Sequence, residues 1–148
     1  MNADGSVLER LSRRECMRLI ASVPVGRIVY TQRALPAVEP VSFALDDGDI
    51  VLRTDLGGML AAAIRQAVVA FEVDDLDYVH RDGWSVTVVG TAREVTDPAD
   101  VTRLRQIGLA AWAPGERELF VRIVPGIITG RWLRHARDVS AGSAARAR

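Results

Sequence analysis

Hydrophobic and polar residues alternate with a period of two over most of the chain from residue 25 to residue 133. This alternation is typical of β-strands that bury one face, and short connections between such runs favour antiparallel neighbours. The turn residues Asp46-Asp47-Gly48 make one such connection. The pattern predicts strands at residues 25–31, 36–45, 49–54, 67–73, 84–93, 119–124 and 127–133, the last two being separated by Pro125-Gly126.

Helical periodicity replaces the alternation in three places. Ser12 and Glu15 form a capping box at the start of a helix over about residues 12–22, which stops before Pro24. A short helix is expected near residues 58–65, and Asp97-Pro98 supplies the N-cap and first-turn proline of a second long helix. Within the first helix, Cys16 is interpreted as a small core residue and not as a nucleophile.

This order of elements predicts a mainly β fold with a few helices. A run of antiparallel strands with short connections favours a closed barrel, because closure removes exposed sheet edges. One domain should occupy residues 11–133, preceded by a flexible N-terminus at residues 1–10. From residue 134 the apolar periodicity is lost, so residues 134–148 are expected to form a disordered tail.

Composition and charge narrow the class of protein. The chain is 49% hydrophobic and 26% charged, which is ordinary for a globular domain. Nineteen basic residues balance nineteen acidic ones, so nucleic acid and membrane surfaces are not expected partners. A single cysteine and the lack of a signal-like or membrane-spanning segment predict a cytoplasmic protein.

The stretch from residue 51 to residue 71 carries the main candidate for binding chemistry. A strand ends in Arg53 and Thr54, and Gly57-Gly58 then opens the short helix. A guanidinium, a hydroxyl and the N–H groups of a helix start can together bind a phosphate. An ordinary strand-loop-helix connection with a surface arginine would have the same sequence. Pro40 inside a strand indicates an edge, a bulge or a ligand beside the backbone.

No catalytic or metal-binding motif is evident. His80 lies in a polar connection and His135 in the tail. The acidic run at residues 72–77 could hold a hard cation, but a solvated loop is the preferred interpretation. If the protein is an enzyme, a cofactor should therefore supply the reactive group, while the protein binds, orients and excludes water.

Several short segments, taken in order, resemble the pyridoxamine 5′-phosphate oxidase-like proteins, which are flavin-binding split barrels. The likeness covers about residues 8–133 and is closest to the small actinobacterial and nitroimidazole-resistance-type members. The segments that carry it are residues 11–15, 22–27, 39–45, 52–54, 69–75, 83–86, 89–90, 112–115 and 129–131.

The resemblance implies a Greek-key split barrel of six or seven antiparallel strands and a homodimer that binds flavin mononucleotide (FMN) between its subunits. In such proteins the flavin ring lies on the segment matching Pro40, Val41, Ser42 and Phe43. The phosphate meets groups matching Arg53, Thr54, Gly57, Gly58 and Met59, and the segment matching Trp84 and Ser85 approaches from the other side.

Many relatives have serine and lysine where this chain has Gly58 and Met59. A charge-assisted hydrogen bond is worth about 1.5–3 kcal/mol, so the substitution bears on affinity for the phosphate. The expected function is FMN-dependent two-electron redox chemistry on a small organic substrate. A noncatalytic sensor or carrier that holds flavin, deazaflavin or haem in the same groove stays open. Pyridoxamine phosphate itself is not the expected substrate, because no second basic phosphate site is evident.

Overall fold

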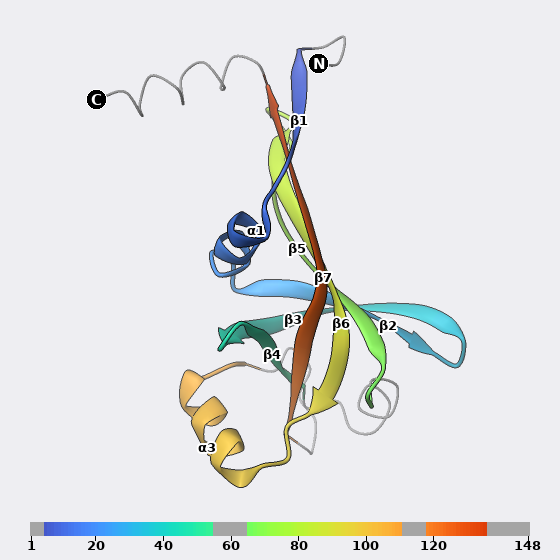
Figure 1. Ribbon diagram of the computed structural model, residues 1–148, viewed down its shortest axis with the longest axis vertical. Helices are drawn as coiled ribbons and strands as arrows, with labels where there is room; N and C mark the ends of the chain where they lie inside the picture. Colours follow the sequence, from blue (N-terminus) through green and yellow to red (C-terminus); the bar gives the residue numbers. More distant parts are fainter. Residues whose placement is uncertain (1–4, 55–64, 111–117, 136–148) are drawn as a thin grey trace.

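The computed structural model describes residues 5–54, 65–110 and 118–135 (Figure 1). These residues form seven strands and two helices. The elements in chain order are β1 (Ser6–Arg10), α1 (Arg13–Ile20), β2 (Val25–Gln32), β3 (Leu35–Asp46), β4 (Asp49–Thr54), β5 (Val68–Asp77), β6 (Asp82–Glu94), α3 (Pro98–Ile107) and β7 (Leu119–His135). The short helix expected at residues 58–65 lies outside the described residues, apart from residue 65.

All strand pairings are antiparallel, and six strands close into a ring. The order β7-β4-β3-β2-β5-β6 returns to β7, because β7 pairs with both β4 and β6, while β1 adds to β7 on the outside. The β3–β4 connection is the tight turn that Asp46-Asp47-Gly48 predicted, and a short connection joins β2 to β3. The closed antiparallel sheet expected from the sequence is therefore confirmed.

Half of β7 leaves the ring and forms a long arm with β1, β5 and β6 (Figure 1). The sequence prediction of two strands broken at Pro125-Gly126 is wrong, because β7 runs unbroken from Leu119 to His135. A register shift absorbs the dipeptide: Val89 pairs with Ile127 and Gly90 with Pro125, so Gly126 is the extra residue of a bulge. A bulge accommodates a proline that cannot donate to the ladder.

Two further expectations are corrected. Residues 6–10, expected to be flexible, form β1 and pair with residues 131–135 of β7. The run at residues 72–77, expected to be a solvated loop, continues β5 as far as Asp77 and pairs with β6 throughout. The local sequence favours a solvent-exposed backbone in both segments, but a neighbouring strand supplies the hydrogen-bond partners of the backbone groups instead. Of the expected tail, Arg134 and His135 belong to β7, and residues 136–148 lie outside the described part.

Both helix starts are as predicted. Ser12 N–H donates to Glu15 Oε2 at 2.7 Å, and Glu15 N–H donates to Ser12 Oγ at 3.2 Å, which completes the capping box. Asp97 accepts hydrogen bonds from the backbone of Ala99 and Asp100 at the start of α3. The helices cover different sides of the sheet. Helix α1 packs on the main core with Cys16 fully buried, whereas Leu104 of α3 packs outside the ring against Val51 and Phe120.

Candidate functional site

Directly paired residues on neighbouring strands point to the same side of a sheet, so the register divides the side chains into two faces. The inner face carries the main core, including Phe43, Phe71 and Val86. The opposite face of β2, β3, β5, β6, β1 and the arm half of β7 is called the outer face. No described helix lies on it. Its exposed large hydrophobic side chains are Leu8, Val38, Val68, Leu76, Val124 and Ile127.

Strand β3 changes neighbours along its length in the described part of the structure. Residues 35–42 pair with β2, whereas β4 pairs with residues 43–46. The Phe43 N–H donates to the Pro24 carbonyl at 3.3 Å, on the β2 side. Because backbone groups alternate along a strand, those of positions 40 and 42 point away from β2, toward the side that is called the β3 edge. The missing N–H of Pro40 therefore costs β3 no hydrogen bond to β2.

The structure brings together three of the predicted site residues on the outer face. Phe43 pairs with Leu52, and one step further along the same register Ser42 lies opposite Arg53. Both side chains point outward with that of Pro40, since Val41, Phe43 and Leu52 fill the core. Thr54, which is 5% exposed, faces inward. The side chains of Arg53 and Thr54 therefore lie on opposite faces and do not converge.

Arg53 projects toward the C-terminal end of α3. Its Nη1 donates to the carbonyl of Leu109 at 3.2 Å, and its Nη2 lies 3.9 Å from Glu118 Oε2. Arg105 also donates to Glu118, at 2.6 Å. Two guanidinium groups thus share one carboxylate, which leaves this corner with a net positive charge among those three side chains. The Arg53 side chain is 30% exposed, so part of that charge reaches solvent.

Trp84 and Ser85 separate in the same way. Trp84 is 5% exposed and lies on the inner face, where it pairs with Trp132. These two tryptophans line an inner-face cavity of about 430 Å³ together with Asp75, Asp77, His80, Asp82 and Gly83. Ser85 pairs with Asp74 and Arg131 on the outer face. Of this predicted pair of residues, only Ser85 shares the face of Pro40, Ser42 and Arg53.

Gly57, Gly58 and Met59 lie outside the described residues. Within the described ranges, no group of three or more histidine, cysteine, aspartate or glutamate side chains could hold a metal ion. None of the helices described there is long and apolar enough to cross a membrane.

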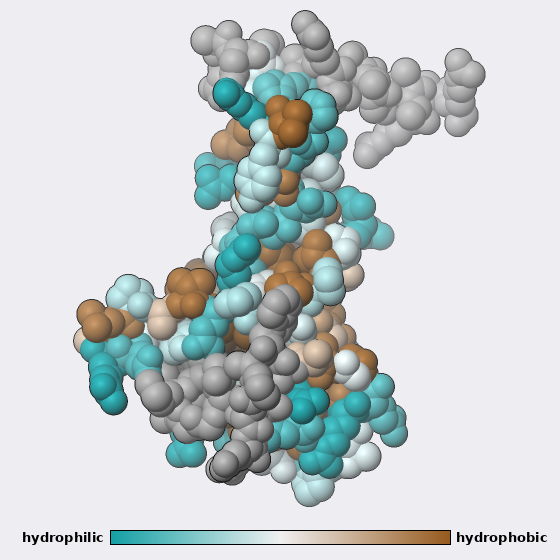
Figure 2. Space-filling view, turned by 180° about the vertical axis from the view of Figure 1, so that it is seen from behind, coloured by the Kyte–Doolittle hydropathy of each residue, from teal (hydrophilic) through white to brown (hydrophobic). Residues whose placement is uncertain are grey.

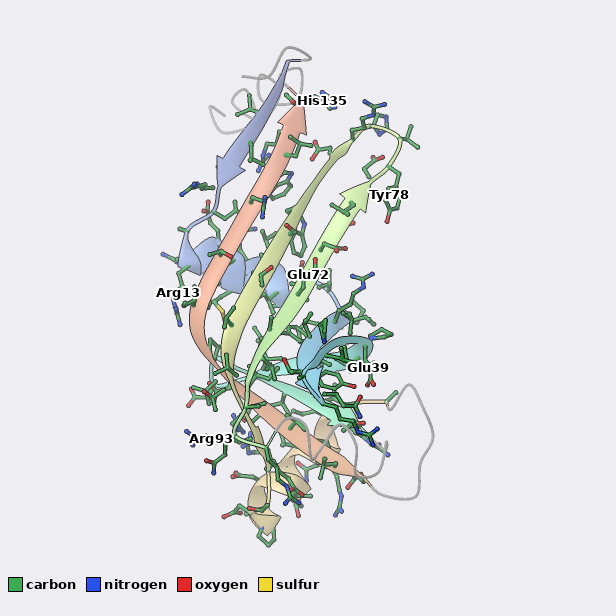
Figure 3. The ribbon with its side chains drawn as sticks, turned by 90° about the vertical axis from the view of Figure 1, so that its right-hand side faces the viewer. Arg13, Glu39, Glu72, Tyr78, Arg93 and His135 are labelled. Carbon is green, nitrogen blue, oxygen red and sulfur yellow. The ribbon has the colours of Figure 1, made fainter. Side chains whose placement is uncertain are left out.

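The sequence reasoning missed a charged cluster on the outer face. Arg27 Nη1 lies 3.3 Å from Glu72 Oε2 and 3.4 Å from Asp74 Oδ2, so one guanidinium serves two carboxylates (Figure 3). Glu72 and Asp74 side chains are about one-quarter exposed, at 25% and 27%. Glu72 and Asp74 are two positions apart, so they would lie on the same face of a strand, and this spacing could have indicated the cluster. The acidic composition instead favours a solvated loop for residues 72–77.

Electrostatics distinguishes this pair from ordinary surface carboxylates. Partial burial, followed by the hydrogen bond and charge of neighbouring Asp74, raises the pKa of Glu72 to about 7. Arg27 opposes the shift but does not cancel it. The Glu72 carboxyl can therefore gain or lose a proton near neutral pH.

A closed antiparallel ring with a projecting arm defines the class as a split barrel. A family model described as pyridoxamine 5′-phosphate oxidase matches residues 12–132, and the chain belongs to that family. The resemblance inferred from the short sequence segments is thereby confirmed.

Three relatives illustrate the similarity. The uncharacterised protein Rv0080 of Mycobacterium tuberculosis is 45% identical over 125 residues, which cover 81% of this chain and 82% of that protein. An FAD-binding protein of Mycobacterium smegmatis is 37% identical with a TM-score of 0.72, over 85% of this chain and 100% of the other. A candidate pyridoxamine 5′-phosphate oxidase of Corynebacterium glutamicum is 31% identical with a TM-score of 0.75, over 85% and 98%.

Proposed function

We propose that two copies of this chain bind a flavin nucleotide in a cleft between their outer faces and use it to oxidise or reduce a small organic substrate by two electrons. The observation that carries the proposal is the β3 segment around Pro40 and Ser42, whose side chains share one face of the sheet with that of Arg53. Family membership and the FAD-binding relative from M. smegmatis support the choice of a flavin.

The β3 edge fits the flat ring of a flavin. Backbone groups at positions 38 and 40 point toward the β3 edge, where the carbonyl of Pro40 can accept a hydrogen bond from a donor on the flavin ring. Pro40 also prevents a further strand from pairing regularly there, because it lacks an N–H. The edge is thus suited to a planar ligand and poorly suited to another β-strand.

Arg53 is the proposed phosphate anchor. Its guanidinium can donate two parallel hydrogen bonds to phosphate oxygens, and it lies on the same face as Ser42. The side chain of Thr54 faces inward, so the proposal assigns it no side-chain contact to the phosphate. FMN is the proposed nucleotide. FAD, which the M. smegmatis relative binds, carries a further nucleotide that must extend beyond this anchor.

A second copy of the chain would complete the cleft. The outer face combines exposed apolar residues with charges of both signs, which suits an interface between two copies of the chain. Figure 2, which views the molecule from behind, shows hydrophobic residues interspersed with hydrophilic ones on the surface. Covering this face excludes water from the cleft. A bound flavin supplies hydride chemistry, while the protein's own residues hold the ring at the β3 edge and fix its phosphate, so that a stacked substrate lies within reach.

The absorption spectrum of purified protein, incubated with FMN or FAD and then desalted, tests the proposal. Bound flavin gives its visible bands, and mass spectrometry of the released cofactor distinguishes FMN from FAD. Anaerobic addition of NADPH or NADH should then bleach the bands. A deazaflavin or haem spectrum, or a protein that retains no chromophore, would contradict flavin binding. A carrier or sensor would be favoured if the protein retains flavin but NADPH and NADH do not reduce it, and if no substrate reoxidises the flavin after reduction by dithionite.

A further inference from the structure

The outer face carries two neighbouring carboxyls, Glu72 and Asp74, that share one guanidinium. We propose that Glu72 is the general acid of the cleft, positioned by Arg27 and Asp74. This inference rests on the proposed function. It adds a proton donor, a role for which the sequence alone offered no candidate.

The sheet register places Glu72 beside the candidate flavin edge. Pro40 of β3 pairs with Arg27 of β2, and Arg27 pairs with Glu72 of β5. All three side chains therefore face outward in one row, and Figure 3 shows Glu72 midway along β5, between the arm tip and the β2–β3 hairpin. Neighbouring strands are about 4.8 Å apart, so Glu72 lies roughly 10 Å across the sheet from Pro40.

A second row runs parallel to the first. Ser85 of β6 pairs with Asp74 on one side and with Arg131 of β7 on the other. Continuing the β2–β5 register two residues beyond its last pair, Arg27 with Glu72, places Asp74 opposite Val25. Val25 in turn pairs with Ser42. The two carboxylates thus lie between the β3 edge and Ser85, the two places where the resemblance to known flavoproteins predicted cofactor contacts.

Among the described residues, two charged groups face Glu72. Arg27 on β2 and Asp74 on its own strand are charged, whereas its β6 neighbours on this face, Ser85 and Thr87, do not titrate near neutral pH. Arg131 lies one strand further away. Helix α1 packs on the opposite face of the sheet. Partial burial, and after it Asp74, therefore favours the protonated form of Glu72, while Arg27 opposes that shift and contacts both carboxyls.

The chemical step balances as follows. A hydride adds to one atom of a substrate double bond and brings two electrons from the reduced flavin, which is thereby oxidised. The π bond breaks, and the electron pair left on the second atom takes the proton of the Glu72 carboxyl, so that an O–H bond breaks and a new bond to hydrogen forms. The product carries two added hydrogens, and the Glu72 carboxylate regains a proton from water.

The first experiment follows the titration of Glu72 without a substrate. Carboxyl ¹³C NMR of the FMN-loaded protein is recorded against pH in the oxidised and the reduced state, with Glu72→Gln to assign the signal. We expect the midpoint, near pH 7, to move when the flavin is reduced, because the added electrons change the local field. Asp75, on the inner face, serves as control and should not respond. An unchanged Glu72 midpoint would place the carboxyl away from the cleft and overturn the proposal.

The second experiment uses 2-cyclohexenone as the probe substrate with NADPH-reduced protein. At pH 6, Glu72→Gln should lower the rate of enone reduction about a hundredfold while flavin affinity and flavin reduction by NADPH stay within twofold. Asp74→Asn should shift the falling limb of the pH profile to lower pH, and Asp75→Asn should change nothing. An unaltered rate and pH profile in Glu72→Gln would overturn the proposal even if its titration responds to the flavin.

The outcomes separate the two ideas. If FMN and FAD both fail to bind, the proposed function falls and the general acid falls with it. If flavin binds and is reduced normally but Glu72 is insensitive to it, only the general acid is refuted. If the native protein does not reduce the enone, the titration midpoint of Glu72 in the oxidised and the reduced protein decides whether the carboxyl lies at the cleft, because that measurement needs no substrate.

Discussion

Ser42 on β3 and Arg53 on β4 face the same side of the sheet, one step beyond the last pair that joins those strands, Phe43 with Leu52. The strands stop pairing where these two side chains meet. A hydroxyl, a guanidinium and the β3 edge are thereby brought together from segments that the sequence only suggested were related. The structure makes four testable predictions, at Arg53, Ile127, Gly90 and Asp46.

Replacing Arg53 by alanine should weaken FMN binding. Loss of a charge-assisted hydrogen bond to phosphate costs about 1.5–3 kcal/mol, or roughly a tenfold to hundredfold change in Kd. Quenching of FMN fluorescence on titration measures the affinity. Arg105→Ala is the matched control, because it removes the other guanidinium that contacts Glu118 and leaves Arg53 in place. An Arg53→Ala affinity within threefold of native would remove Arg53 from the phosphate site.

Introducing a charge at Ile127 should disrupt the proposed homodimer. Ile127 is 64% exposed on the outer face, and burying a lysine there against a second copy is unfavourable. Sedimentation equilibrium of Ile127→Lys should show monomer at concentrations where native protein is dimeric. Leu35→Lys is the control, since Leu35 is 68% exposed at the β2–β3 turn and pairs in the inner-face register. Equal dimerisation of both variants would place the interface elsewhere.

A methyl group at Gly90 should strongly destabilise the fold. An ideal Cβ there would lie 2.1 Å from the carbonyl oxygen of Val124, so the backbone at the β6–β7 bulge must move. Chemical denaturation of Gly90→Ala should show a loss of about 3 kcal/mol or more, or no cooperative folding. Gly48→Ala is the comparison: its φ of +81° is strained for alanine, but nothing lies within 4 Å of the new methyl group, so about 1 kcal/mol is expected.

Asp46 should make stability depend on pH in the acid range. Hydrogen bonds from Arg103 and Arg122 hold the pKa of Asp46 below its usual value of 3.8. A carboxyl with a lowered folded-state pKa stabilises the fold above its unfolded pKa, and this contribution is lost as pH falls through the folded value. Asp46→Asn should therefore cost about 1.5–3 kcal/mol at pH 7, as expected for hydrogen bonds to a charged group.

Thermal or urea unfolding at several pH values measures the effect. The gap between Asp46→Asn and native protein should begin to narrow near pH 4 and should close once the pH is below the lowered folded-state pKa of Asp46, where both side chains are uncharged. Asp100→Asn is a suitable control, because the exposed Asp100 carboxylate pairs with Arg103, at 3.2 Å, and an exposed ion pair contributes little to stability. A gap that persists unchanged at pH 3 would mean that packing, and not the ion pairs, accounts for the cost.

Much of the fold could be predicted from local pattern. The period-two runs located six of the seven strands, and the capping box at Ser12 and the N-cap at Asp97 located both described helix starts. These features depend on residues a few positions apart, so the sequence displays them directly. The strand count agreed partly by coincidence, because β1 was missed while β7 was divided in two.

The candidate site was less predictable for a physical reason. Alternation along a strand requires that adjacent residues point to opposite faces, and this separates Arg53 from Thr54 and Trp84 from Ser85. The sequence grouped adjacent residues into one site, whereas the structure places Thr54 and Trp84 on the inner face and Arg53 and Ser85 on the other. Glu72 and Asp74 were overlooked because their acidic composition resembles that of a loop.

The sequence by itself determined the antiparallel strands, their turns, their helix caps and which residues share a face within each strand. Only the tertiary structure decided how the faces of different strands combine. Arg122 meets Asp46 across 76 residues and Arg27 meets Glu72 across 45, through registers that no local pattern records. Those registers are set by closing the ring around one core, because a slip of one residue would turn each buried side chain toward solvent.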